Sequence, residues 1–298
     1  MRGDSAQRAY DPHVGVNFWD SQTILDHPRF PHARSVYLER VLNLYGSDVF
    51  LNKLLMEGVR IVIFSASICM AAGYRVEDRD TWPTIGNLKR ALAQFGLASP
   101  RRIDHVVARL IQTNYLESQV SPLDRRVRLL LPTDKMIEHD QNWLVAHYAP
   151  LAALFGEEDY ALVLGGDPEF QKVQRRIATD FFTRSAMVLL RNPDIMLFLA
   201  RDGGIFVLIE LAKEMADRAS STVDLSLTRL GRRFSISRTH VRQLLQAAEA
   251  QGLVEILQSE RLIVLKPRLI ESLDRFIADG MANHDLTGAA AMREIRSR

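Results

Sequence analysis

The sequence predicts a mainly α-helical fold with small β-hairpins, organised as two similar units joined by a helical middle segment. Amphipathic stretches with the helical period dominate the chain, whereas strand-like runs are short and occur in two places. In both places the order is helix, tight turn, helix, strand, turn, strand. Displacing one stretch by 137 positions aligns Arg101 with Arg238, Val107 with Leu244 and Leu116 with Leu253. A repeated pattern of this kind indicates two copies of one structural unit.

The composition of the 298-residue chain is that of a globular protein with at least two domains. Hydrophobic residues make up 47% and charged residues 25%, which excludes a disordered, collagen-like or disulfide-dense chain. The single cysteine, Cys69, can form no internal disulfide and suits a reducing cytoplasm. The first residues contain no apolar signal core, and the longest apolar run, 61–74, is shorter than the ~20 residues that span a bilayer. We therefore expect a cytoplasmic protein with no membrane partner.

The net charge of +2 conceals an uneven distribution of charged residues. Residues 83–132 hold eight Lys and Arg against three Asp and Glu, which gives +5. Residues 223–267 hold seven against four, which gives +3, so the remainder of the chain is −6. Two basic islands in an acidic background favour a polyanionic partner.

The N-terminal third separates into an arm and the first unit. Residues 1–34 show no clear period, which predicts an irregular arm, and a helical signal begins near Ser35. Residues 1–46 are therefore expected to form an arm and a short helix. The first unit covers residues 47–132 and opens with a helix over 47–73. Between residues 59 and 70 this helix is apolar nearly all round, so we expect it to be buried between subunits.

Two further helices and a hairpin complete the first unit. An amphipathic helix over 85–95 follows, and Ser99 with Pro100 begins the next helix, over 99–112. Its apolar residues recur at helical spacing and form one inward face: Ile103, Val106, Val107, Leu110 and Ile111. Strands over 114–120 and 127–131 then enclose a basic turn.

The C-terminal half repeats this order after a helical segment. Residues 133–202 are expected to form a helical linker that also mediates dimerisation, with a long helix over 170–190. Residues 203–280 form the second unit, and residues 281–298 a flexible tail. Within the second unit we expect helices over 205–216, 224–234 and 237–251, strands over 253–257 and 261–265, and a last helix over 269–277.

The order of elements in both units resembles the winged helix-turn-helix, whose second helix enters the DNA major groove while the hairpin wing contacts the backbone. The segment Ser235-Ile236-Ser237-Arg238-Thr239-His240-Val241-Arg242 closely resembles the recognition helices of bacterial transcription regulators of the S-x-S-R-T-x-V-R type, over about forty residues. The general plan is similar to the MarR-like winged helix. That family usually has one unit per chain, whereas two are expected here, so MarR-like ligand sites are not carried over.

Outward residues on the two second helices and on the wings are the candidate DNA-binding residues. Ser, Thr, Gln, His and Arg hydrogen-bond base edges and phosphates, and no acidic residue lies in 235–243. The candidates are Ser99, Arg101, Arg102, His105, Arg109, Arg125, Arg126, Arg128, Ser235, Ser237, Arg238, Thr239, His240, Arg242, Gln243 and Arg261.

These features predict a transcription regulator that binds specific double-stranded DNA sequences through two winged helix-turn-helix units. Three alternatives stay open: a plasmid-type replication initiator, a protein-docking subunit of a chromosome-condensation complex, and a regulator whose middle segment binds a small-molecule effector. A homodimer is expected because a two-fold protein matches a palindromic site.

Signals for an enzyme are poor. The chain has no G-x-G-x-x-G, G-x-x-x-x-G-K-[ST] or G-x-S-x-G motif. His139 and His147 lie eight residues apart but have no cysteine or third ligand beside them, so we interpret them as core or surface histidines. We expect neither catalysis, nor a cofactor, nor a metal.

Overall fold

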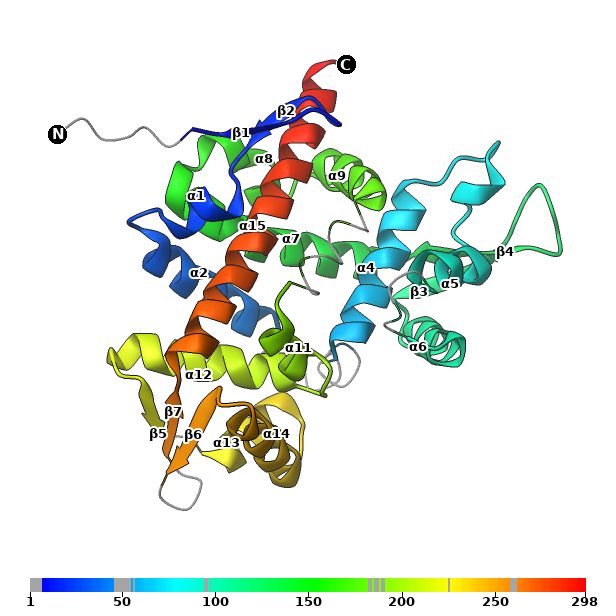
Figure 1. Cartoon of the computed structure of the whole chain (residues 1–298). Coiled ribbons are helices and arrows are strands. Elements are labelled where there is room, and N and C mark those ends of the chain that lie inside the picture. The colour runs from blue at the N-terminus through cyan, green and yellow to red at the C-terminus, as the bar shows by residue number, and fades with distance from the viewer. Residues whose placement is uncertain are drawn as a thin grey trace.

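The computed structural model describes residues 7–45, 55, 57–93, 96, 98–181, 184, 188, 191–224, 226–257 and 262–298. The part of the expected helix at 47–73 that precedes residue 55 lies outside this range, as do Arg261 and the turn of the second hairpin. Helices dominate the described chain, and its strands form three small antiparallel sheets (Figure 1). The expectation of a mainly helical fold with small hairpins is confirmed.

The first half of the chain contains the N-terminal hairpin and the first unit. Its elements are β1 (Ala9–Asp11), β2 (Val16–Phe18), α1 (Ser21–Leu25), α2 (Phe30–Tyr45), α4 (Gly58–Ala72), the 3₁₀ turn η1 (Arg79–Thr81), α5 (Ile85–Ala93), α6 (Pro100–Gln112), β3 (Leu116–Val120) and β4 (Arg128–Pro132).

The second half contains the middle segment and the second unit. Its elements are α7 (Asp134–Phe155), η2 (Glu158–Tyr160), α8 (Ala161–Leu164), α9 (Pro168–Asp180), α11 (Pro193–Leu199), α12 (Gly204–Arg218), β5 (Thr222–Asp224), α13 (Leu227–Phe234), α14 (Arg238–Ala250), β6 (Val254–Leu257), β7 (Leu262–Leu265) and α15 (Pro267–Arg296).

The two units have similar orders of elements but different sheets. In the first, β3 pairs with β4, and the backbone N–H of Leu130 in β4 donates to the carbonyl of Pro83 at 2.7 Å. In the second, β5 takes the corresponding place as a third strand, giving the order β5-β7-β6. A displacement of 137 positions superposes the bounds of α6 on α14 and of β3 on β6 to within one residue.

The chain does not end in a flexible tail at 281–298, as expected from the sequence. Helix α15 instead runs for 30 residues to Arg296 and crosses the molecule from the second unit to the N-terminal hairpin (Figure 1). It packs against α1, α7, α9, α11 and β2. Small residues in its second half, including Gly288 and Ala291, allow this close approach: a Cβ at Gly288 would meet the Tyr148 hydroxyl at 2.7 Å.

Two other expectations about helices need correction. Helix α4 is buried, as expected, but within its own chain, where it packs against α9, β4 and the two helices that follow it. The long helix expected over 170–190 ends at Asp180, and most of the residues beyond Phe181 up to 190 lie outside the described range. In the arm, the short β1–β2 hairpin and helix α2, which starts at Phe30 rather than near Ser35, replace the irregular segment.

Candidate nucleic-acid interface

Helix α6 presents a clean division between an inward and an outward face. It begins where the Ser99 hydroxyl accepts a hydrogen bond from the backbone N–H of Arg102, with Pro100 in the first turn, where a missing N–H costs nothing. Four of the five apolar residues expected on the inward face are buried: Ile103, Val106, Val107 and Leu110. Ile111, expected there as well, is 37% exposed. Fixing this face in the core turns the opposite one to solvent.

The outward face of α6 carries basic side chains. Arg101, His105 and Arg109 are all exposed. Among the described residues, neither Arg101 nor Arg109 has a carboxylate within 4.0 Å. Asp104, the acidic residue of this helix, is paired with Lys89 of α5 at 2.6 Å. The face therefore keeps a net positive potential.

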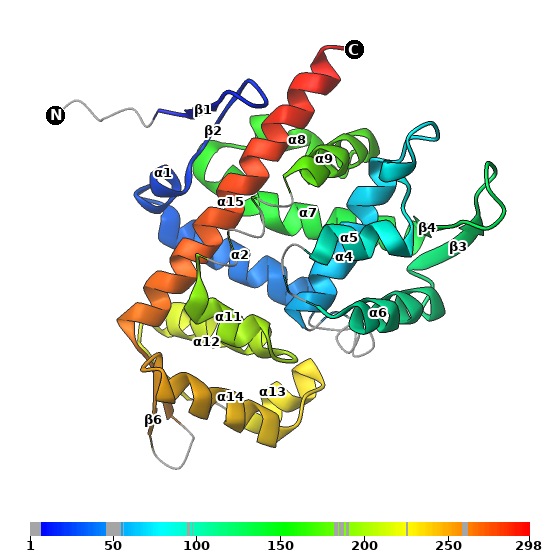
Figure 2. The ribbon, with the colours of Figure 1, turned by 45° about the vertical axis from the view of Figure 1, so that its right-hand side comes forward.

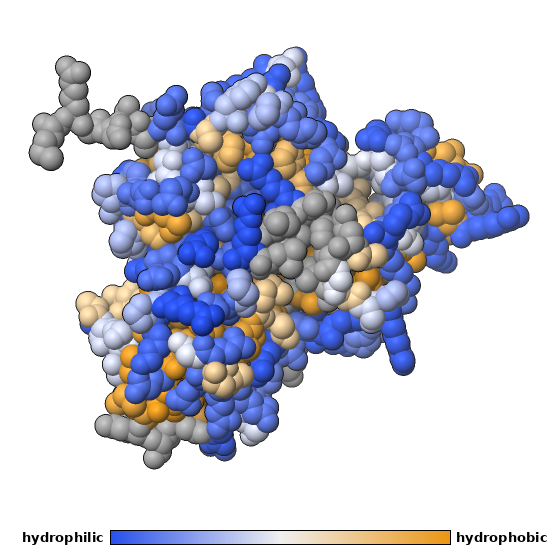
Figure 3. All heavy atoms as spheres, in the orientation of Figure 1, coloured by the Kyte–Doolittle hydropathy of each residue, from blue (hydrophilic) through white to orange (hydrophobic). Residues whose placement is uncertain are grey.

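The β3–β4 hairpin extends this basic surface away from the body of the molecule. Arg125 and Arg126 lie in the turn and Arg128 at the start of β4, and all three side chains are exposed. Asp124 accepts from the backbone N–H of Arg126 at 3.1 Å, which holds the turn. In Figures 1 and 3 the hairpin is the projection at the right of the molecule, where hydrophilic side chains cover its tip.

Helix α14 of the second unit is built in the same way. The Ser237 hydroxyl accepts from the backbone N–H of His240 at 3.1 Å and caps the helix. The inward face is apolar and buried: Val241, Leu244, Leu245 and Ala248. The side chains of Arg238, Thr239, Arg242 and Gln243 are exposed.

Helix α13 is held against α12 by ion pairs, one of whose carboxylates is buried. Glu210 of α12 is only 3% exposed and pairs with Arg233 at 2.6 Å and with Arg229 at 3.3 Å. Glu214 also pairs with Arg229, at 2.6 Å. These two arginines, which contribute to the basic island in the sequence, therefore dock α13 onto α12 and add little positive potential outside.

The turn between α13 and α14 is tight and depends on its backbone. Ser235 closes α13 in the left-handed region, with φ of 55°. Gly231 lies so close to the next turn that a Cβ there would be 2.7 Å from the carbonyl oxygen of Ile236. Larger residues at position 231 would push the two helices apart.

A chain of polar contacts joins the N-terminal ends of α6 and α14. Arg102 of α6 pairs with the buried Glu57, which also accepts from Nε of Arg60 at 3.2 Å. Nη2 of Arg60 reaches Oδ1 of Asp202 at 3.5 Å. The backbone carbonyl of Asp202 accepts from Nε2 of His240 in α14 at 2.8 Å. The starts of the two second helices are thus fixed to one junction, and Figure 2 shows the helices at the lower right and bottom of the molecule.

The structure therefore gives the predicted residues different roles. The exposed group, with side chains directed to solvent, comprises Arg101, His105, Arg109, Arg125, Arg126, Arg128, Arg238, Thr239, Arg242 and Gln243. Arg102 and His240 are engaged in the junction, and Ser99 and Ser237 cap helices. Ser235 is half-buried in the turn, and Arg261 lies outside the described residues.

Sequence reasoning missed Arg232 as a candidate residue. Its side chain is exposed on α13, beside the turn that leads to α14. Its place directly before Arg233, in the last turn of the helix, is a weak signal, because sequence alone does not tell which of the two arginines docks internally.

The two histidines set aside as core or surface residues lie in different surroundings. His139 contacts the rings of Tyr45, Phe64 and Tyr115. His147 lines a cavity in the middle of the molecule. Within the described part of the chain no group of three or more His, Cys, Asp or Glu is placed to hold a metal ion.

Comparisons of the chain with protein-family models, with curated proteins and with solved structures give no match. No helix of the described residues is both long and apolar enough to cross a membrane. The functional assignment therefore depends on the arrangement of the chain's own residues.

Proposed function

We propose that this chain is a transcription regulator that binds specific double-stranded DNA sequences through two winged helix-turn-helix units. The first unit consists of α4, α5, α6 and the β3–β4 wing, and the second of α12, β5, α13, α14 and the β6–β7 wing. The observation that carries the proposal is that both second helices bury an apolar face and expose basic side chains on the opposite one. Residues 235–243 contain no acidic side chain, and Asp104 of α6 is paired with Lys89.

Each unit contributes different contacts in this proposal. Helices α6 and α14 lie in major grooves, where Arg and Gln side chains reach base edges. Arg238, Thr239, Arg242 and Gln243 make these contacts in the second unit. Arg125 and Arg126 of the first wing bind the flanking phosphates, since a projecting hairpin tip reaches the backbone while the helix occupies the groove.

The contacts at the junction set the spacing of the two reading helices. Glu57 and Asp202 hold Arg102, Arg60 and His240, so the starts of α6 and α14 are joined through one set of contacts. One chain then presents two reading helices at a fixed separation, as a dimer of single-unit regulators would.

The one argument for a homodimer in this proposal is that a two-fold symmetric protein matches a palindromic DNA site. The apolar face of α4, whose sequence pattern predicts a subunit interface, is buried within the chain and gives no argument for one. Sedimentation equilibrium, against the chain mass of 33.8 kDa, decides the oligomeric state.

The experiment is a salt titration of binding to random-sequence duplex DNA, read by fluorescence anisotropy. Two double variants are compared with the unmodified protein: Arg125→Ala with Arg126→Ala, and Arg238→Ala with Arg242→Ala. A third, Arg40→Ala with Arg275→Ala, removes the same charge from exposed positions on α2 and α15 and serves as the matched control.

The slope of log K against log salt falls by about 0.9 for each phosphate that the protein no longer neutralises, so removal of both wing arginines lowers it by about 2. The Arg238 and Arg242 variant lowers the affinity for DNA. It also lowers the slope by about 0.9 for each of these two side chains that binds a phosphate. The control leaves both unchanged. Absence of binding at low salt would instead favour the protein-docking alternative, and protection confined to repeated origin sites would favour a replication initiator.

A further inference from the structure

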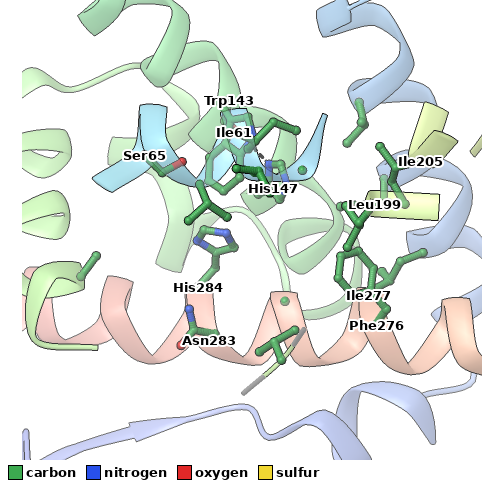
Figure 4. A pocket seen from close by; sticks show the side chains of 18 of the residues that line it. Ile61, Ser65, Trp143, His147, Leu199, Ile205, Phe276, Ile277, Asn283 and His284 are labelled. Atoms are coloured by element: carbon green, nitrogen blue, oxygen red, sulfur yellow. Dashed lines mark hydrogen bonds between the residues drawn. The ribbon is translucent and has the colours of Figure 1, made fainter. Parts of the chain in front are cut away.

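A cavity of about 450 Å³ lies in the middle of the molecule, between the two units. Helix α4 of the first unit and α12 of the second form part of its wall, and α2, α7, α9, α11 and α15 contribute further lining residues. Most of the lining is apolar and aromatic, including Ile61, Trp143, Leu199, Ile205 and Phe276 (Figure 4). Its size and lining are those of a small-molecule site.

Polar side chains gather at one end of this cavity. His147 of α7 and His284 of α15 point into the same space in Figure 4, with ring centroids 5.2 Å apart. Gln174 of α9 also lines this end. His284 is 8% exposed and Gln174 1%, yet Nδ1 of the first and Oε1 of the second have no hydrogen-bond partner among the described residues. Buried polar atoms without partners are rare in native proteins and need an explanation.

The protein's own hydrogen bonds fix two of these groups as acceptors. Nδ1 of His147 lies 2.8 Å from the carbonyl oxygen of Trp143, which can only accept, so Nδ1 carries the proton and Nε2 the lone pair. Burial lowers the pKa of His147 to about 4, so the ring is neutral at pH 7.

The hydrogen bonds of the Thr287 hydroxyl fix the orientation of the Gln174 amide. The Thr287 hydroxyl donates to the carbonyl oxygen of Asn283 at 2.9 Å, so it accepts from the Gln174 amide nitrogen, also at 2.9 Å. Gln174 Oε1 is therefore left as an acceptor.

The charges around the cavity favour a neutral occupant. Among the described residues that line it, Arg175 is the only Arg or Lys, and Asp140 binds its guanidinium through Nε at 2.9 Å and Nη2 at 2.7 Å. Burial also holds the pKa of His284 well below its usual value. A carboxylate would find no free cation among these lining residues, whereas a hydroxyl would find acceptors.

We infer that the cavity is a binding site for a neutral, largely apolar small molecule with an aromatic ring and one hydroxyl group. The ring packs among the aromatic and aliphatic side chains, and the hydroxyl donates to His147 Nε2 or Gln174 Oε1. The site goes beyond DNA binding and can be tested without DNA.

Isothermal titration calorimetry with a panel of 4-alkylphenols, from methyl to hexyl, tests this inference. The matched 4-alkylanisoles have the same ring and chain but no donor. We expect at least one phenol to bind on the order of tenfold more tightly than its anisole, since an acceptor left unpaired in a buried site costs about that much.

Two variants distinguish this site from binding elsewhere. Gly280 lines the cavity on α15, and a Cβ there meets nothing within 4 Å. Gly280→Leu therefore starts from an open position, extends into the cavity and removes an unfavourable helix glycine. We expect it to abolish phenol binding while the protein stays folded, and Gly280→Ala to retain binding.

The second variant, His147→Phe, keeps a ring against Trp143 but removes the acceptor. It should weaken phenol binding on the order of tenfold and leave anisole binding unchanged. His32→Gln, at an exposed position on α2, is its control. The inference is overturned if no phenol of the panel binds, if anisoles bind as tightly as phenols, or if Gly280→Leu binds like the unmodified protein.

Discussion

The buried ion pair between Asp140 of α7 and Arg175 of α9 makes a quantitative prediction about stability. Both side chains are at most 5% exposed, and the carboxylate receives two hydrogen bonds from the guanidinium and a third from Gln171 at 2.9 Å. Asp140→Asn keeps the shape of the side chain but leaves the charge of Arg175 in the core without an opposite charge. Breaking a buried pair from one side costs about 3–5 kcal/mol.

Urea unfolding followed by circular dichroism measures this cost. With a denaturant slope of about 3 kcal/mol/M, the midpoint should fall by more than about 1 M. The double variant Asp140→Leu with Arg175→Met replaces the pair with apolar side chains and should recover most of the loss. Asp217→Asn, which breaks the exposed pair with Lys213, is the control and should cost less than about 0.5 kcal/mol. A change below about 1 kcal/mol in Asp140→Asn, or a double variant no more stable than it, would refute this reasoning.

Two further predictions concern pH and the turn of the second unit. Because burial lowers the pKa of His147 to about 4, against an ordinary value of 6.5, the unfolded chain binds more protons between these values. The free energy of unfolding should therefore fall as pH drops from 6.5 towards 4, and His147 should contribute up to about 1.4 kcal/mol of this fall per pH unit. His147→Phe should remove that contribution, which urea titrations at pH 7 and pH 5 measure. Burial also lowers the pKa of His284 and raises the pKa of Asp274 and Asp285, and these three groups are present in both proteins. Gly231→Ala should lower the free energy of unfolding by about 1–3 kcal/mol, since its Cβ would be 2.7 Å from a backbone oxygen. Gly86→Ala on α5, where a Cβ has nothing nearer than 3.9 Å, is the control and should not lower it. Equal thermal midpoints for the two variants would contradict the prediction.

Local signals in the sequence were sufficient for the second helix and the hairpin of each unit, but not for β5 (Thr222–Asp224), which ends where a helix over 224–234 was expected to begin. The cap at Ser99 with Pro100 and the spacing of the apolar residues predict α6 correctly to its end at Gln112. The strands β3 and β4 lie within two residues of their expected positions. These features depend on neighbours along the chain, which a pattern can reveal.

Features that depend on distant partners were not predictable. The second half of α15 has many alanines and a weak apolar period, and it is ordered by packing against α7 and α9. Likewise, the pattern of α6 does not distinguish Arg102, which pairs with Glu57, from Arg101, which has no carboxylate within 4.0 Å among the described residues. Tertiary contacts settle both cases.

Selection from a random duplex library, followed by hydroxyl-radical footprinting on the enriched site, tests sequence-specific binding by both units most directly. We expect one enriched sequence with two protected patches per chain. The Arg125 and Arg126 variant should lose protection at one patch and the Arg238 and Arg242 variant at the other. No enriched sequence, or a single patch that both variants affect equally, would contradict binding by two units.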